Sequence, residues 1–136
     1  LDDLACRSGL LGMSGRSGDV RDLEEAAAEG DERADMALKA FTASIRHYLG
    51  GYMALLGGAN VIVFTGGIGE NSRRIRADVC NNMSWAGLKL DAEANANASG
   101  EARISTDDSN IEVWIVPTNE EIVVARQTAA ALDTSH

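Results

Sequence analysis

Apolar residues recur at helical spacing along the first half of the 136-residue chain. Between residues 32 and 56 they return every three or four positions, which predicts one long helix with an apolar face. Gly57 and Gly58 end this pattern, whereas Gly50 and Gly51 interrupt it and predict a kink or close packing. We interpret the apolar face as core or as a subunit interface. Its members are Ala34, Leu38, Phe41, Ile45, Leu49, Tyr52 and Leu56.

A shorter helix is predicted over residues 20–29. Asp19 is a suitable N-cap, because its carboxylate can accept hydrogen bonds from the first free N–H groups, and Gly30 is a suitable stop. The preceding residues 7–18 are rich in glycine and serine, so we expect a loop or a short strand there.

Two runs of β-branched and aromatic residues predict strands. Residues 61–64 read Val-Ile-Val-Phe, which is typical of a short buried strand, and residues 111–116 read Ile-Glu-Val-Trp-Ile-Val before Pro117. Helices are expected after both strands, over about residues 72–84 and from Thr118 to about residue 132.

The alternation of helices and strands predicts an α/β layer with at least two parallel strands. Residues 86–90 are expected to add a short strand, and residues 91–102, which show no period, to form an exposed loop or a frayed turn. So few strands make a thin sheet. We therefore expect part of the fold to come from chain outside this sequence.

Length and charge narrow the class of protein. The length suits a single domain over residues 1–136, and 12 basic against 21 acidic residues give a net charge of −9, which argues against nucleic acid or an anionic membrane surface as partner. The apolar runs are too short for a membrane span, and no signal-like start is visible, so a cytoplasmic protein is the default expectation. The start Leu1-Asp-Asp-Leu4 looks like mid-domain sequence, which suggests a fragment.

The cysteines and histidines show no metal-ligand spacing. Cys6 and Cys80 form no Cys-x-x-Cys pair, and His47 and His136 lie far from them in the sequence. We expect both cysteines to be reduced and packed as small apolar residues.

The first candidate site follows the strand at 61–64. Three glycines, Gly66, Gly67 and Gly69, precede Asn71 and Ser72, which can cap the next helix; such a turn lets an anionic ligand approach backbone N–H groups.

A tight connection without any ligand also fits this turn, and so does a dinucleotide fingerprint, Gly67-x-Gly69-x-x-Ser72 with Asp91 further on. Ser72 in the third glycine position and Glu70, whose carboxylate would repel a pyrophosphate, disfavour the dinucleotide interpretation.

The second candidate site lies at residues 17–22. Asp19 can accept hydrogen bonds from ribose hydroxyls, and the planar guanidinium of Arg21 can stack on a base or pair with phosphate. An ordinary N-cap and a solvated first-turn arginine explain the same residues.

The third candidate site is Pro117-Thr-Asn-Glu-Glu121. Thr118 and Glu121 match a capping box, which leaves Glu120 available to hold a hydrated Mg²⁺. A favourable charge near a helix N-terminus explains Glu120 equally well.

Charged runs elsewhere are interpreted mainly as solvated surface. Ser72-Arg-Arg-Ile-Arg76 could steer an anionic nucleotide, but a solvated helix face is favoured. The acidic residues Glu24 and Glu25 are interpreted in the same way.

Together these segments resemble the C-terminal part of the acetate kinases, over nearly the whole chain. The matching stretches are Ser8-Gly-Leu-Leu-Gly-Met-Ser-Gly15, Gly18-Asp-Val-Arg-Asp22, Val63-Phe-Thr-Gly-Gly-Ile-Gly-Glu-Asn-Ser72 and Val116-Pro-Thr-Asn-Glu-Glu121. Propionate kinases look much the same in this region, and butyrate kinases are more distant. Val20 stands where phenylalanine is common in relatives, which affects local packing only.

The resemblance implies a ribonuclease-H-like, actin-like ATPase fold, of which this chain is the incomplete C-terminal nucleotide-binding half. It implies reversible, ATP-dependent phosphorylation of acetate or another short-chain carboxylate, with ATP or ADP and Mg²⁺, by a homodimer. The residues expected to bind the nucleotide are Asp19, Val20, Arg21, Gly67, Ile68, Gly69, Glu70 and Asn71, and Glu120 is expected to bind the metal. The acyl-binding and catalytic groups are expected in an upstream domain, so no catalytic residue is assigned here and the isolated chain is expected to be inactive.

Overall fold

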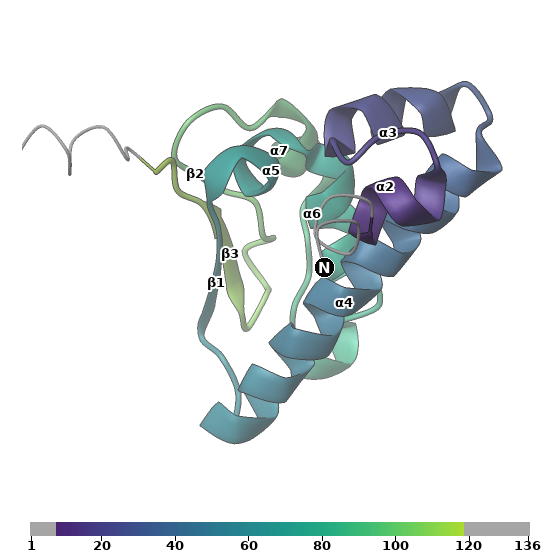
Figure 1. Cartoon of the computed structure of the whole chain (residues 1–136). Coiled ribbons are helices and arrows are strands. Elements are labelled where there is room, and N and C mark those ends of the chain that lie inside the picture. The colour runs from purple at the N-terminus through teal and green to yellow at the C-terminus, as the bar shows by residue number, and fades with distance from the viewer. Residues whose placement is uncertain (1–7, 119–136) are drawn as a thin grey trace, which may run out of the picture.

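A computed structural model describes residues 8–118, in which a small sheet lies beside the long helix α4 (Figure 1). The elements are α2 (Gly9–Ser14), α3 (Val20–Ala28), α4 (Glu32–Leu56), β1 (Val61–Phe64), α5 (Gly66–Asn71), α6 (Arg73–Cys80), a 3₁₀ turn at Ser84–Ala86, α7 (Ala92–Asn97), β2 (Ala102–Arg103) and β3 (Glu112–Ile115). The predicted helix after Thr118 lies outside the described residues. Within residues 8–118, none of the helices is long and apolar enough to cross a lipid bilayer.

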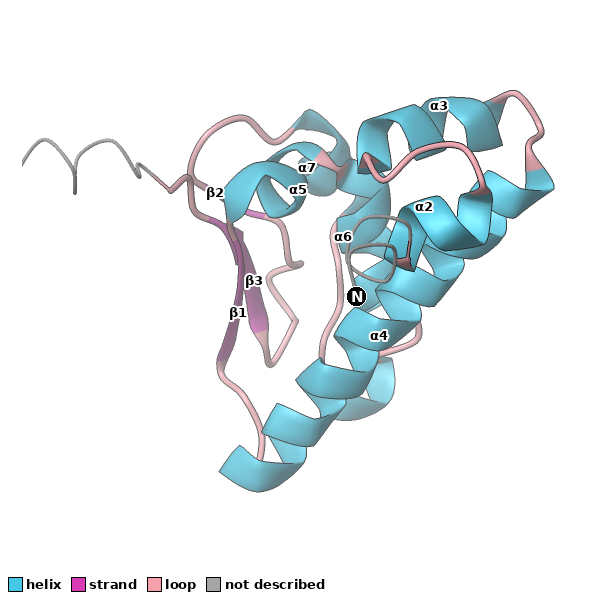
Figure 2. Cartoon of the chain, viewed as in Figure 1, coloured by secondary structure: helices cyan, strands magenta, loops and turns pink. Residues whose placement is uncertain are grey.

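The sheet has the strand order β1-β3-β2 (Figure 2). β1 pairs with β3 in parallel, from Val61 opposite Glu112 to Phe64 opposite Ile115, which confirms the predicted parallel pair. β2 pairs with β3 in antiparallel orientation and was not predicted. In the described part of the chain β1 is an edge strand.

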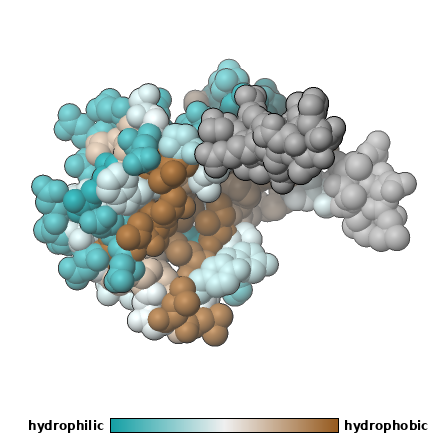
Figure 3. Space-filling model, turned by 90° about the vertical axis from the view of Figure 1, so that its left-hand side faces the viewer, coloured by the Kyte–Doolittle hydropathy of each residue, from teal (hydrophilic) through white to brown (hydrophobic). Residues whose placement is uncertain are grey.

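The prediction that β1 is buried was wrong. Val61 and Val63 are 49% and 50% exposed, because only one face of β1 is covered by described residues. Figure 3 shows apolar side chains gathered on this side of the molecule. A groove of about 490 Å³ runs here between α4 and β1, and Phe41, Ile45, Tyr48, Tyr52, Val63 and Phe64 are among its lining residues.

Helices α3 and α4 confirm the predicted pattern and its caps. Asp19 accepts a hydrogen bond from the N–H of Arg21 at the start of α3, and Gly57, in the left-handed conformation with φ of 73°, ends α4. α4 continues through Gly50 and Gly51, and apart from the helix's own backbone no atom of residues 8–118 lies within 4 Å of a Cβ added at either position, so the expected close packing is not found among these residues.

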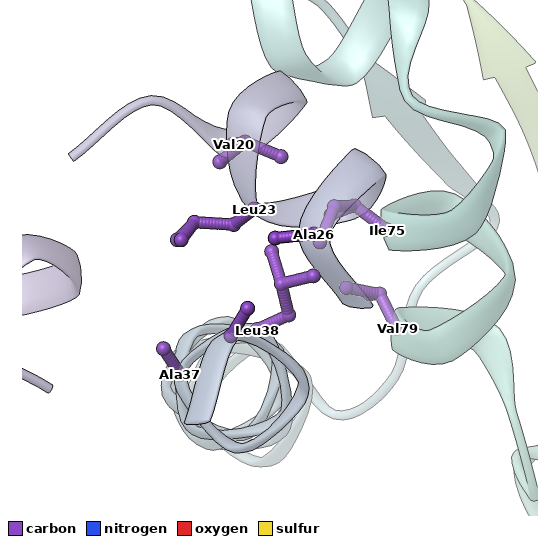
Figure 4. Close-up of a cluster of buried hydrophobic side chains, with 8 residues drawn as sticks. Val20, Leu23, Ala26, Ala37, Leu38, Ile75 and Val79 are labelled. Carbon is purple, nitrogen blue, oxygen red and sulfur yellow. The ribbon is translucent and has the colours of Figure 1, made fainter. Parts of the chain in front are cut away.

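The apolar face of α4 forms core along only part of its length. Ala34 and Leu38 are fully buried in a cluster with residues of α3 and α6, including Leu23, Ile75 and Val79 (Figure 4). A second cluster of Cys80, Met83, Leu88, Ile104, Ile111, Val113 and Ile115 fills the space under the sheet. Further along α4, Tyr52 and Leu56 are 61% and 79% exposed.

Cys80 confirms the expectation of a reduced, buried cysteine. It is free, and burial raises the pKa of its thiol to about 11. Cys6 and His136 lie outside the described residues.

Two predicted loops are helices. Residues 9–14 form α2, which ends at Gly15 with φ of 68°, and Leu10 packs against the α3–α4 core. Residues 92–97 form α7, because Asp91 accepts hydrogen bonds from the N–H groups of Glu93 and Ala94. Neither helix was predicted, because both segments contain glycine, serine or asparagine, which have low helix propensity.

The segment between α6 and α7 also differs from its prediction. α6 ends at Cys80 rather than near residue 84. The strand expected at 86–90 is reduced to one isolated bridge between Leu90 and Ser105.

Candidate functional site

A cleft of about 690 Å³ is lined by residues at the start of α3, in α5 and at the start of α6. Figure 1 shows these three segments at one end of the molecule. Its lining residues are Gly18, Asp19, Val20, Arg21 and Glu24 on one side and Gly67, Ile68, Asn71 and Ser72 on the other. The structure therefore brings together two of the three loops that the sequence singled out, although they are far apart along the chain.

Asp19 and Arg21 form a pair on the rim of this cleft. Asp19 Oδ1 accepts the backbone N–H of Arg21 at 2.8 Å, and the Arg21 guanidinium donates to Oδ1 from Nε at 3.3 Å and to Oδ2 from Nη2 at 2.9 Å. These side-chain and backbone hydrogen bonds lower the pKa of Asp19 and raise that of Arg21. Because the Arg21 side chain is 81% exposed, the pair adds little stability, and a ligand can replace either partner.

Val20 exposes little of its side chain to the cleft. It is 4% exposed and packs in the same cluster as Leu23 and Leu38. This packing fixes the first turn of α3 on the core and so sets the positions of Asp19 and Arg21 on either side.

Residues 66–71 form the short helix α5 instead of the predicted open turn. Gly66, with φ of 72°, lets the chain turn from β1 into this helix. A Cβ added at Gly67 would meet no atom of the described residues within 4 Å apart from the backbone of its own helix, so a ligand can approach the backbone there. Asn71 donates from Nδ2 to the carbonyl of Gly67 at 2.8 Å, and within residues 8–118 nothing donates to its Oδ1.

Gly69 faces the sheet and does not line the cleft. A Cβ at this position would lie 3.2 Å from the carbonyl carbon of Phe64, closer than ordinary van der Waals contact. Gly69 therefore allows α5 to pack directly on the end of β1.

Glu70 also points away from the cleft, towards the end of β3. Its Oε1 accepts the N–H of Gly66 at 2.9 Å, the N–H of Thr118 at 2.9 Å and the hydroxyl of Thr118 at 3.1 Å. The hydrogen bonds from Thr118, and then that from Gly66, lower the pKa of Glu70. The carboxylate thus holds α5 against the strand ends, a contact that no pattern along the sequence indicated.

Glu24 and Ser72 are cleft residues that the sequence interpretation missed as a pair. The hydroxyl of Ser72 donates to Glu24 Oε1, which joins α3 to α6, and Ser72 also accepts the N–H of Ile75 at 3.0 Å as the cap of α6. Ser72 was predicted as a possible cap of this helix, and its hydrogen bond with Ile75 confirms that prediction. Glu24 lies three positions after Arg21, and this spacing, which puts the two side chains on the same side of a helix, is the signal that could have placed it beside the cleft.

The solvated interpretation of the arginine run was wrong for two of its members. Arg74 is paired with Asp35 of α4. Arg76 is only 2% exposed, and its guanidinium donates to the carbonyls of Gly69 and Glu70. The periodicity of α6 places Arg76 next to Ile75 and one turn before Cys80, on the buried side.

The two carboxylates considered in the dinucleotide interpretation, Asp91 and Glu70, have structural roles in this fold. Asp91 caps α7, and Glu70 is held by Gly66 and Thr118. Neither carboxylate lines the cleft.

Glu120 and its neighbour Glu121 lie outside the described residues. Within residues 8–118 no group of three or more histidine, cysteine, aspartate or glutamate side chains is placed to hold a metal ion. The metal prediction for Glu120 therefore stays a prediction.

The sequence of this chain matches known proteins over nearly its whole length. Residues 2–126 match the model of the Acetokinase family. The chain belongs to this family. Among curated members of the family, the acetate kinase of Natranaerobius thermophilus is 50% identical over 126 residues, which are 93% of this chain and 32% of that protein. The acetate kinase of Finegoldia magna is 52% identical over 122 residues, 90% of this chain and 31% of that protein.

Solved structures of the family confirm the predicted fold class. The crystal structure of Porphyromonas gingivalis acetate kinase matches with a TM-score of 0.84 at 42% identity, over 93% of this chain and 32% of that one. A propionate kinase from Francisella tularensis matches with a TM-score of 0.78 at 33% identity, over 88% and 30% of the two chains. The described residues are thus part of an actin-like α/β ATPase fold. The chain spans about a third of the length of the relatives it matches.

Proposed function

We propose that this chain is the nucleotide-binding part of an acetate kinase, an enzyme that phosphorylates acetate with ATP to give acetyl phosphate and also runs in reverse. The observation that carries the proposal is the cleft, in which the Asp19–Arg21 turn faces α5 across a space of about 690 Å³. The proposed reaction is inferred from family membership, and the proposed nucleotide site is inferred from the cleft.

The residues of the cleft fit a nucleotide chemically. Asp19 is an exposed acceptor for ribose hydroxyls, and Arg21 is an exposed cation that can stack on a base or pair with phosphate. Gly67 and Ile68 offer backbone and an apolar contact, and Asn71 offers an amide at the end of α5. Val20 supports this rim from the core, and Gly69 and Glu70 hold α5 in place beneath it.

The remaining parts of the active site belong to other segments in this proposal. Glu120 binds the Mg²⁺ that accompanies the nucleotide, since carboxylate oxygen is a ligand this ion prefers. An upstream domain of a longer protein supplies the carboxylate-binding groups and the charges that stabilise phosphoryl transfer. The complete enzyme is a homodimer in the cytoplasm. Propionate is the alternative acceptor, because a propionate kinase shares this part of the fold.

Calorimetric titration of the full-length protein that contains this sequence tests the nucleotide assignment. We expect saturable binding of Mg-ADP, no binding of NAD, and formation of acetyl phosphate from ATP and acetate. NAD binding in place of ADP binding would contradict the proposal. ADP binding without any phosphorylation of acetate or propionate would favour the second candidate, a nucleotide-binding module without catalysis.

Activity assays and thermal denaturation of two variants distinguish the proposed roles of Glu120 and Glu121. Glu120→Ala is expected to raise the Mg²⁺ concentration needed for activity without changing the thermal midpoint. Glu121→Ala is expected to lower the thermal midpoint if it completes a capping box with Thr118. The reverse pattern would exchange the two roles.

A further inference from the structure

Resting on the proposed nucleotide site, we propose that Arg76 is a positioning residue that holds α5 in its nucleotide-binding conformation and couples it to α7 through Asn95. Arg76 does not line the cleft, so it acts on the nucleotide only through α5.

The guanidinium of Arg76 lies under the last residues of α5. Its Nη1 donates to the carbonyl of Gly69 at 3.0 Å and to that of Glu70 at 2.8 Å. The last carbonyls of a helix lack partners within the helix and carry its negative dipole end, so a cation at this point satisfies and stabilises them. Arg76 thus caps α5 from the following helix.

Asn95 of α7 fixes the orientation of this guanidinium. Its Oδ1 accepts from Arg76 Nε at 2.7 Å, and its backbone carbonyl accepts from Nη2 at 3.0 Å. Its own Nδ2 donates to the carbonyl of Arg73 at 2.9 Å. Asn95 is 5% exposed and Arg76 is 2% exposed, so the network is shielded from water.

The partners of Arg76 are unusual for a buried cation. Among residues 8–118 no carboxylate forms an ion pair or hydrogen bond with it, although the charge of Glu24 acts on it from a greater distance, and all four of its hydrogen-bond acceptors are neutral oxygens. A buried charge satisfied only by carbonyl and amide oxygens is sensitive to their exact positions, because losing one acceptor leaves a desolvated donor. Arg76 therefore selects one arrangement of α5 and α7 among nearby alternatives.

α5 needs such external support. It has six residues, three of them glycine, and a helix this short and glycine-rich is not stable by itself. Glu70 holds its first N–H, at Gly66, and Arg76 holds its last carbonyls. The orientation of Gly67 and Asn71 in the cleft depends on both.

The test compares Arg76→Lys with Arg46→Lys in the full-length protein. Arg46 is a matched control, because its Nη1 also donates only to backbone carbonyls, those of Asp78, Val79 and Asn81, but it lies away from α5. Lysine keeps the charge and loses the planar fork of donors. In the protein without ligand, we expect hydrogen exchange of residues 66–72 and 92–98 to rise about ten-fold or more in Arg76→Lys and to stay unchanged in Arg46→Lys.

The kinetic readout separates positioning from general loss of stability. In Arg76→Lys we expect KM for ATP to rise about ten-fold while KM for acetate changes less than about two-fold. An equal rise of both constants, or the same exchange pattern in the Arg46→Lys control, would overturn the proposal. If Arg76→Lys does not fold, Asn95→Ala replaces it as the test, because this substitution removes only the Oδ1 acceptor and the Nδ2 donor. We expect the same changes in KM for ATP and in hydrogen exchange, with smaller magnitudes. An unchanged KM for ATP together with unchanged exchange in Asn95→Ala would overturn the proposal.

The exchange measurement needs no ligand. If the wild-type protein fails to bind ADP, the proposed function fails, whereas protection of residues 66–72 still decides whether Arg76 holds α5.

Discussion

Glu70 and Thr118 join the ends of two parallel strands through one carboxylate oxygen. Glu70 follows β1 and Thr118 follows β3, and Oε1 of Glu70 accepts both the N–H and the hydroxyl of Thr118, together with the N–H of Gly66. The carboxylate therefore fixes α5, which carries one wall of the cleft, to the strand that leads into the predicted metal-binding segment.

The Glu70 contact predicts a pH-dependent stability. The folded pKa of Glu70 is lowered, so its stabilising effect is complete above the unfolded-state pKa of about 4.3 and is lost as pH falls through the lower folded value. Glu70→Gln is expected to lower the thermal midpoint at pH 7 and to differ progressively less from wild type below about pH 4. Thermal denaturation across this range checks the prediction, with the exposed Glu101→Gln as control. A difference that grows towards low pH would show that the carboxylate contacts are absent.

Gly67 and Gly69 predict opposite effects of the same substitution. Alanine at Gly67 meets open space and favours a helix, so Gly67→Ala is expected to stabilise the fold by up to about 1 kcal/mol while weakening ADP binding through its added methyl group. Alanine at Gly69 would press on the backbone of Phe64 and is expected to destabilise the fold by about 1–3 kcal/mol. Chemical denaturation and ADP titration of the two variants measure both quantities. Unchanged ADP affinity in Gly67→Ala would remove Gly67 from the site.

Asp19 has two roles that asparagine can separate. Asparagine is as good an N-cap as aspartate, so Asp19→Asn is expected to keep the thermal midpoint within about 2 °C of wild type. It removes the charge that pairs with Arg21 and one acceptor for ribose hydroxyls, so ADP affinity is expected to fall about ten-fold. Calorimetry with ADP and with adenine alone, which has no ribose, checks the assignment. Equal losses for both ligands would place Asp19 away from the ribose.

The sequence predicted the elements whose apolar residues repeat regularly. α3, α4, β1 and β3 follow from period and caps, and the parallel pairing follows from their order. α2 and α7 were missed because Gly9, Gly12, Asn95 and Asn97 weaken the helical signal, while the packing of Leu10 and the cap at Asp91 decide the outcome.

Local chemistry and the family resemblance predicted only part of the candidate site. Asp19, Arg21 and Gly67 line one cleft, and their role in binding a nucleotide stays a prediction. The contacts of Glu70 with Thr118 and of Arg76 with Asn95 join residues distant in sequence, and no pattern along the chain encodes such pairs. Arg76, which was predicted to face solvent, is buried and donates to the carbonyls of Gly69 and Glu70 in α5.

The exposed face of β1 predicts opposite effects in the short chain and in the full-length protein. Val63 lies on an edge strand at 50% exposure beside the apolar groove along α4 (Figure 3), and such an edge invites pairing with another strand. Since the chain spans about a third of its relatives, we expect other segments of the full-length protein to cover this face. Val63→Lys is then expected to reduce self-association of the 136-residue chain, because a charged edge residue opposes pairing, and to destabilise the full-length protein by about 1–3 kcal/mol.

Light scattering measures self-association of the short chain, and chemical denaturation measures the stability of the full-length protein. Ser44→Lys, at an exposed position of α4, is the control for the added charge. A full-length protein that tolerates Val63→Lys as well as Ser44→Lys would show that this face stays open to solvent.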